Sequence, residues 1–101
     1  MYLLVMFDLP TKEKRDRRIY RRFRKRLLSL GFTKIQFSVY LKFAESDAYS
    51  ESIKRKIRKV LPRFGNIRII SLPPKTFDKM EIYNNHEKIE NESPRPNFIV
   101  F

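Results

Sequence analysis

The sequence predicts an α+β sandwich with the ferredoxin-like element order βαββαβ. Two long segments carry apolar residues every three or four positions, as amphipathic helices do. Short apolar runs precede and follow each of them and are long enough for strands but not for helices. The order of these elements is that of the split βαβ arrangement. With 101 residues, the chain fits a single domain with one modest core.

The first element is an uncharged run, Tyr2–Phe7, which is typical of a buried central strand. The strand meets its first charge at Asp8. Pro10 suits a turn from strand to helix, and we expect Thr11 to cap the helix that follows.

The second element is a helix over residues 12–30, about 28 Å long at a rise of 1.5 Å per residue. Ten of the residues from 12 to 26 are basic and only two, Glu13 and Asp16, are acidic. Gly31 is expected to end the helix in the left-handed conformation. The apolar face of this helix consists of Ile19, Phe23, Leu27 and Leu30.

Residues 32–43 alternate imperfectly between apolar and polar, which predicts two strands with a tight turn near Gln36-Phe37. Ser46 or Asp47 can cap a second helix, which Pro62 ends. The apolar residues of this helix repeat every four positions, at Tyr49, Ile53, Ile57 and Leu61.

A further strand is expected over residues 67–72, stopped by two prolines, and residues 75–83 are expected to form a short helical turn leading into Ile82-Tyr83. We therefore place the ferredoxin-like domain at residues 1–83. Residues 84–101 are expected to form a polar linker, up to Pro96, and a strand-forming tail. The tail, Asn97–Phe101, is almost wholly apolar and suits a sheet edge of its own chain or of a partner.

The charge of the chain points to an anionic partner. Its net charge is +12 and its pI is about 10.3, and such a charge repels itself in the folded state. The basic residues gather in two stretches, 12–26 and 54–59, whereas a surface built only for solubility mixes both signs. We expect a polyanion, with contacts mostly to phosphate because no pattern for base readout is present.

Membrane and secretory roles are disfavoured. No apolar stretch approaches the ~18 residues of a spanning helix, and the N-terminus lacks the features of a secretory signal. The chain has no cysteine, which excludes disulfides and thiolate metal sites. We therefore expect a cytoplasmic protein that does not bind membranes.

Asp8 is the candidate for chemistry. A carboxylate at the end of a strand can hold Mg²⁺ when further ligands face it, or it can bond the backbone of the turn at residues 9–11. One carboxylate per chain makes a poor metal site, but two copies meeting on a two-fold axis would make a better one. Both interpretations stay open at the level of the residues.

Other candidate residues have simpler interpretations. His86 lies in a polar segment and is expected to be a solvated surface histidine, and Ser38 is expected to be a strand or turn hydroxyl. Phe37, Tyr40 and Phe43 fit core packing, although aromatic residues on a sheet can also stack bases, as in an RNA-recognition motif.

Taken together, these parts resemble the Cas2 family of small CRISPR-associated adaptation proteins. The shared pattern is an apolar strand ending in Asp8, an arginine-bearing first helix, Gly31, and the run Gln-Phe-Ser-Val-Tyr at 36–40. Residues 6–11, 20–25 and 65–67 look most like the subgroup from systems with the Cas9 effector. The resemblance covers nearly the whole chain.

The resemblance implies a two-fold homodimer whose C-terminal strands dock on sheet edges. Family members take part in spacer acquisition: they bridge two dimers of the Cas1 integrase and hold the middle of the duplex DNA to be inserted. Some members are Mg²⁺-dependent endonucleases on RNA or duplex DNA. In those, the aspartate that matches Asp8 flanks the metal from both protomers, which implies a catalytic and metal-binding role for Asp8.

Two positions depart from the family pattern. Phe7 precedes the aspartate where many members have tyrosine, which implies that a hydroxyl near the metal is missing. Leu41-Lys42 replace a frequent acidic-Gly pair.

The alternative functions for this chain are an RNA-recognition-type binding module or a toxin-like endoribonuclease. From the resemblance, phosphate contacts are expected at the start of the first helix, from Lys14, Arg15, Arg17, Arg18, Arg21 and Arg22.

Overall fold

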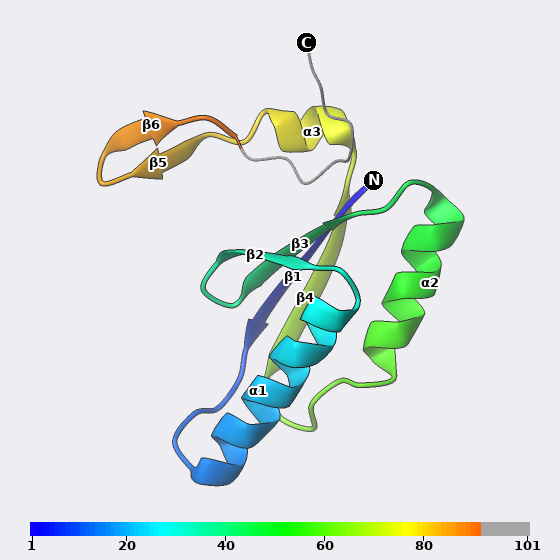
Figure 1. Cartoon of the computed structure of the whole chain (residues 1–101), viewed down its shortest axis with the longest axis vertical. Helices are drawn as coiled ribbons and strands as arrows, with labels where there is room; N and C mark the ends of the chain where they lie inside the picture. Colours follow the sequence, from blue (N-terminus) through cyan, green and yellow to red (C-terminus); the bar gives the residue numbers. More distant parts are fainter. Residues whose placement is uncertain (92–101) are drawn as a thin grey trace.

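The computed structural model describes residues 1–91 and has a four-stranded antiparallel sheet with two helices on one face (Figure 1). The strand order is β2-β3-β1-β4, which confirms the predicted ferredoxin-like fold. The strands of the sheet are β1 (Tyr2–Asp8), β2 (Thr33–Gln36), β3 (Val39–Phe43) and β4 (Asn66–Leu72). The helices on its face are α1 (Lys14–Ser29) and α2 (Asp47–Arg58).

The central strand β1 carries different side chains to the two faces of the sheet. Its residues Leu3, Val5 and Phe7 pack in one buried cluster with residues of both helices, such as Phe23 and Ile57. Successive side chains of a strand alternate, so the intervening residues from Tyr2 to Asp8 lie on the opposite face. We call this opposite side, which α1 and α2 do not cover, the open face.

Helix α1 begins later than predicted. Its N-cap is Glu13 rather than Thr11, and the Glu13 backbone N–H donates to the Asp16 carboxylate at 3.2 Å, as in a capping box. The expected N-cap at Thr11 and the helix start at residue 12 are therefore wrong. With 16 residues, the helix is about 24 Å long. Gly31 follows its end with φ +95°, as predicted.

Helix α2 begins as predicted and ends early. The Ser46 hydroxyl accepts a hydrogen bond from the Tyr49 backbone N–H at 3.1 Å, so Ser46 is the N-cap. Ile53 and Ile57 are buried, but Tyr49 and Leu61 are exposed. The helix ends at Arg58, so Leu61 lies in the following loop rather than on the helical face.

The turn between β2 and β3 lies close to the predicted place and is made without glycine. Ser38 adopts φ +59°, the left-handed conformation that the turn needs. It is held there by two contacts. The hydroxyls of Tyr20 and Ser38 share a hydrogen bond of 2.9 Å, and the Phe7 backbone N–H donates to the Ser38 carbonyl at 3.1 Å.

A third helix, α3 (Pro74–Asp78), covers part of the open face. Its Phe77 forms a second buried cluster with Tyr2 and Leu41. The rings of Tyr2 and Phe77 are stacked with centroids 4.1 Å apart. Elsewhere on this face apolar side chains stay accessible, and Ile70 is 46% exposed.

Strands β5 (Ile82–Asn84) and β6 (Glu87–Ile89) form a hairpin that projects from the body (Figure 1). Asn85 and His86 have positive φ angles, as a two-residue hairpin turn of type I′ requires. The predicted domain boundary at residue 83 falls inside this hairpin, so the linker interpretation is wrong for residues 84–89. The predicted tail strand at 97–101 lies outside the described residues.

Candidate nucleic-acid interface

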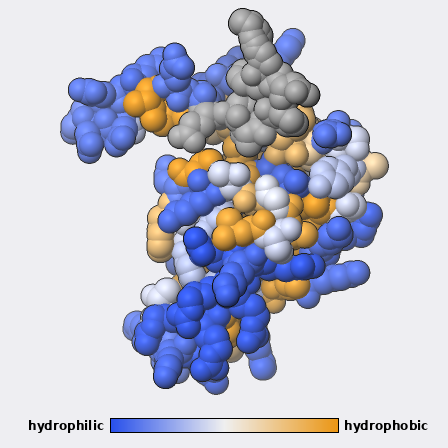
Figure 2. Space-filling view, viewed as in Figure 1, coloured by the Kyte–Doolittle hydropathy of each residue, from blue (hydrophilic) through white to orange (hydrophobic). Residues whose placement is uncertain are grey.

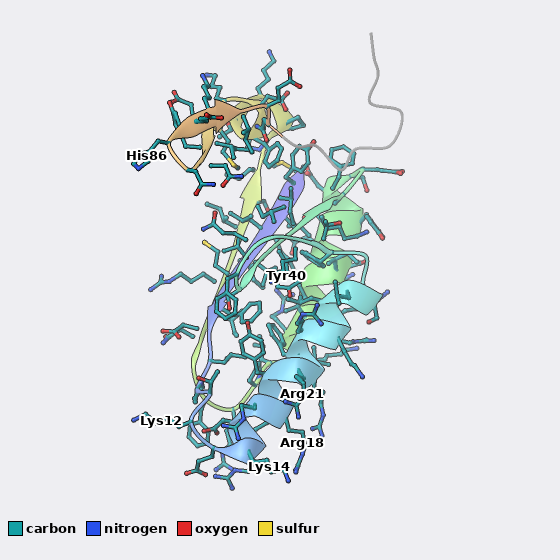
Figure 3. All side chains as sticks on the ribbon, turned by 60° about the vertical axis from the view of Figure 1, so that its left-hand side comes forward. Lys12, Lys14, Arg18, Arg21, Tyr40 and His86 are labelled. Carbon is teal, nitrogen blue, oxygen red and sulfur yellow. The ribbon has the colours of Figure 1, made fainter. Side chains whose placement is uncertain are left out.

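The basic residues predicted to contact phosphate lie along the N-terminal half of α1. All six, from Lys14 to Arg22, are exposed. Figure 2 shows a mostly hydrophilic surface over this helix. In Figure 3, Arg18 and Arg21 lie on the side of α1 turned away from the sheet, whereas Lys12, in the preceding loop, points to the other side.

The cations of α1 are not balanced by acids. Asp16 accepts a hydrogen bond from the backbone at the start of the helix and thereby takes part in the cap. Within residues 1–91, the structure gives no ion pair to any lysine or arginine of α1. On α2, in contrast, Lys54 forms an ion pair with Glu51, with the nitrogen and oxygen 3.2 Å apart. The positive charge of α1 is therefore available to an external anion.

Arg17 makes hydrogen bonds that stabilise the structure in addition to carrying charge. Its guanidinium nitrogen Nη1 donates to the backbone carbonyls of Thr11 and Lys12, at 3.0 and 2.8 Å. These bonds hold the loop between β1 and α1 against the first turn of the helix. Arg17 thus fixes the entry into the basic helix as well as adding charge to it.

The basic surface continues from α1 onto the loop after α2. A groove of about 720 Å³ lies between them, and its apolar lining residues include Ile19 and Leu61. Its cationic lining residues are Arg22, Lys25, Arg26 and Arg63. Exposed cations on α2, including Arg55 and Arg58, extend the same helical side of the molecule. Arg22 is therefore part of a broader cationic surface and not only of the helix start.

Asp8 lies on the open face at the carboxyl end of β1, and its side chain is exposed. It lines a small cavity of about 220 Å³ at the end of the sheet. Asn66 lies directly across from it in β4, and Arg68 lies across from Met6 in the same register. Both Asn66 and Arg68 line the cavity with Asp8. The site therefore combines one carboxylate, one amide and one guanidinium.

Arg68 was missed in the sequence analysis, although a signal was present. Within β4, Ile67 and Ile69 pack against the helical cluster, so the residues between them must face the other way. Alternation along residues 66–70 therefore places Arg68 on the open face. The pairing that brings it next to Asp8 depends on the strand order and register, which local patterns do not supply.

No complete metal centre is formed within the described residues. Residues 1–91 contain no group of three or more His, Asp or Glu side chains placed to hold an ion. Asp8 and Asn66 supply two hard oxygen donors of the kind that Mg²⁺ prefers. A second carboxylate would have to come from another copy of the chain.

The two departures from the family pattern lie away from the Asp8 carboxylate. The Phe7 ring is buried on the helical side and packs against Tyr20, Phe23 and Tyr40. A hydroxyl on this ring would therefore belong to the core and not to the open face. Leu41 is buried in the second cluster.

The predicted aromatic surface divides into buried and exposed residues. Tyr40 is only 1% exposed and lies between the sheet and the helices (Figure 3), so it cannot stack a base. Phe43 packs edge-on against Tyr2 in the second cluster. Phe37, in contrast, is 72% exposed. These three residues therefore do not form one exposed stacking surface on the described sheet, and core packing is confirmed for Tyr40 and Phe43 only.

The remaining sequence predictions concern His86, Ser38 and membranes. His86 is exposed at the tip of the β5–β6 hairpin, far from α1 (Figure 3). Ser38 is a turn hydroxyl, as expected. Among the described residues, the helices are all too short or too polar to cross a bilayer.

Comparison with known proteins points to one family. Residues 1–80 match the family model described as CRISPR associated protein Cas2. A protein of Campylobacter jejuni named CRISPR-associated endoribonuclease Cas2 is 37% identical over 97 residues, covering 92% of this chain and 68% of that protein. A protein of the same name from Flavobacterium psychrophilum is 36% identical over 101 residues, covering 100% of this chain and 88% of that protein.

A solved structure shares the fold. The crystal structure of Streptococcus pyogenes Cas2 at pH 6.5 superposes with a TM-score of 0.64 at 22% sequence identity. The match covers 83% of this chain and 100% of that one. At this identity the likeness shows the common architecture.

Proposed function

Because this chain belongs to the family of CRISPR-associated Cas2 proteins, we propose that it is the duplex-DNA-binding subunit of a spacer-acquisition complex. The observation that carries the proposal is the exposed basic side of α1, where no acid of the described residues pairs with the cations. Such a surface suits the regularly spaced phosphates of a duplex and requires no base readout.

The working unit is a two-fold homodimer that joins through the open face. A monomer leaves apolar side chains of this face accessible, among them Ile70. Burying such a face against a second copy is the usual way to remove it from water, and two-fold dimers are the commonest oligomers. The dimer would present two copies of α1 outward, one on each side, and bridge two dimers of the Cas1 integrase.

Charge reversal on α1 tests the DNA-binding role. The double variant Arg15→Glu/Arg18→Glu is expected to lose most of its affinity for duplex DNA, because it replaces attraction to phosphate with repulsion. Fluorescence anisotropy with labelled duplexes of increasing length measures the loss. The matched control is Lys75→Glu/Lys79→Glu, which makes the same change of charge on exposed residues at α3. Equal losses in the two double variants would show that net charge, not α1, governs binding.

A second candidate function is metal-dependent cleavage of a phosphodiester at Asp8. It is supported by the exposed Asp8 carboxylate beside Asn66 and Arg68 in one cavity, and by the relatives named endoribonuclease. Asp8, from both protomers, and the Asn66 amide oxygen would hold Mg²⁺, which supplies charge stabilisation and an activated water when bound. Arg68 can bind a phosphate oxygen and so orient the backbone of the substrate.

Substitution of Asp8 separates the two functions. Asp8→Ala and Asp8→Asn are expected to abolish Mg²⁺-dependent cleavage of RNA or DNA on a denaturing gel and to leave duplex binding intact. Asp47→Asn, an exposed aspartate at the start of α2, is the control for a lost surface charge. Cleavage that persists in Asp8→Ala would exclude Asp8 as the catalytic residue.

The same variant tests whether spacer integration needs the carboxylate. We expect Asp8→Ala to support integration when combined with the Cas1 integrase, because bridging depends on α1 and on the dimer. Loss of integration in a folded, dimeric Asp8→Ala protein would contradict this view of the bridging role.

A further inference from the structure

Phe37 is an exposed aromatic residue at the tip of the β2–β3 turn, close to the Asp8 site. Its side chain is 72% exposed, the most of any large hydrophobic residue among the described part of the chain. A Phe so exposed gains little from folding, since its ring stays in water. The turn could carry a polar residue at no cost to the core, so packing within one chain does not explain the ring.

The turn that carries Phe37 is tightly held. Ser38, the next residue, has φ +59° and bonds the Tyr20 hydroxyl of α1 and the Phe7 backbone of β1. The turn is thus tied to the basic helix and to the strand that ends in Asp8. An aromatic ring on such a turn is placed before any ligand arrives, which lowers the entropic cost of binding.

The ring of Phe37 is oriented by its neighbours. It stacks on Tyr20 with ring centroids 6.1 Å apart and an angle of 21° between the planes. The Lys34 ammonium lies over the Phe37 ring, 5.7 Å from its centroid. An aromatic ring with a mobile lysine cation over it offers a stacking surface for a base and a charge for its phosphate, as in sites for single-stranded nucleic acids.

Phe37 shares its cavity with the proposed catalytic group. The hollow of about 220 Å³ at the end of the sheet is lined by Phe37, Ser38 and Asp8, and also by Asn66 and Arg68. A nucleotide whose phosphate lies between Asp8 and Arg68 would therefore have its base within reach of the Phe37 ring.

We propose that Phe37 is a stacking platform for one unpaired base of a single-stranded nucleic acid whose phosphate lies at Asp8. This inference rests on the proposed cleavage function and names the form of its substrate. A base within a duplex is stacked on its neighbours and cannot place its face on Phe37, so the site selects unpaired nucleotides. Stacking is tolerant of sequence, because every base has an aromatic face.

Binding without cleavage tests the proposal. A short RNA and a DNA of the same sequence, each with a fluorescent adenine analogue, are titrated with the Asp8→Ala protein and with the same protein carrying Phe37→Ala. Phe37→Ala is expected to lower the affinity for the single strands about 5- to 160-fold and to remove the quenching of the analogue. Affinity for duplex DNA should not change.

The chain provides a matched control in Phe64. It is also an exposed phenylalanine, at 62%, and the Arg63 guanidinium lies 5.7 Å from its ring centroid. Phe64 lines a different hollow, beside Pro10 and Ile19. Phe64→Ala should therefore leave single-strand binding unchanged, and Phe37→Trp should preserve it with quenching of the new indole on binding.

Equal affinities of Phe37→Ala and its parent for both single strands would overturn the proposal, as would equal losses in Phe37→Ala and Phe64→Ala. A loss for RNA but not DNA would assign RNA as the ligand, and the reverse would assign DNA. Failure of stacking leaves Mg²⁺-dependent cleavage to be judged separately by Asp8→Ala. Absence of cleavage in the wild-type protein would in turn leave the binding result intact.

Discussion

At the scale of single residues, the Asp8 site depends on a glycine that lies behind it. Gly65 has φ +95°, and a Cβ built on it would lie 2.6 Å from the Asp8 carbonyl oxygen and 2.7 Å from Leu9 Cδ2. A side chain at this position therefore forces the strand end and the next loop apart. Gly65 is the residue that permits β4 to approach the end of β1 so closely.

Gly65→Ala is expected to lower the free energy of unfolding by about 1–3 kcal/mol, through backbone strain and the clash with Asp8. Urea denaturation measures the change. Gly31→Ala is the control, because Gly31 also has φ +95° but its Cβ would meet only the Lys42 side chain, whose end can move. If both variants were destabilised equally, the clash at Asp8 would play no part.

Residue types in the sequence were sufficient to select Asp8 and the cations of α1 as candidate site residues. Asp8 is the first charge after an uncharged run, and the cations outnumber the acids around them. Arg68 was not found in the same way, and Phe37 was expected among core or base-stacking aromatic residues rather than beside Asp8. Their proximity to Asp8 arises from the pairing of β4 with β1 and from the position of the β2–β3 turn, which are tertiary facts.

At the scale of elements, α1 packs against the core with one side and, in the proposed function, faces a polyanion with the other. Phe23 and Leu27 are buried against the sheet, while the arginines of the opposite side are exposed. The spacing of apolar residues predicted this helix well. Its start was misplaced because an acidic capping box at Glu13 took the place of the threonine cap.

Two neighbouring leucines test how α1 is anchored. Leu27 is fully buried, whereas Leu28 is 39% exposed. Leu27→Ala is expected to cost about 2–5 kcal/mol in the free energy of unfolding, because it leaves a cavity under the helix. Leu28→Ala should cost well under half of that. Thermal and urea unfolding of the two variants give the comparison. Similar losses of unfolding free energy in Leu27→Ala and Leu28→Ala would mean that α1 does not pack on the sheet through Leu27.

The hairpin of β5 and β6 shows where element prediction failed. Residues 84–89 look like a linker because they are polar, yet Asn85 and His86 supply the two positive φ angles of a tight hairpin turn. Turn geometry rather than hydrophobicity therefore determines this element. The sequence does contain a turn signal here, because Asn84 and Asn85 stand where the two short segments that become β5 and β6 meet.

At the scale of the whole molecule, the open face should set the oligomeric state. Ile70→Asp places a charge on this face, where Ile70 is exposed in the single chain. We expect this substitution to shift the proposed dimer toward monomer in sedimentation-velocity experiments, because a carboxylate would have to be buried in the interface. Leu28→Asp, an equal change on an exposed leucine of α1, is the control. A dimer unaffected by Ile70→Asp would place the interface elsewhere.

The net charge of +12 has a consequence for the whole complex. Each phosphate neutralised by a cation releases counterions, so the proposed binding to DNA is expected to weaken steeply as salt rises. If a dimer contacts ~8 phosphates, the affinity falls roughly 10⁴-fold between about 50 and 200 mM salt. An affinity for DNA that stayed high and did not change with salt would mean that phosphate contacts do not dominate the binding energy.

The central claim, that α1 holds the phosphates of duplex DNA, is tested most directly by the salt dependence of duplex affinity in wild type and in Arg15→Gln/Arg18→Gln. Each lost contact should reduce the slope of log affinity against log salt by about 0.9, so the double variant should lose roughly 1.8 per protomer. A variant whose slope equals that of the wild type would contradict the account, because its arginines would then not be touching phosphate.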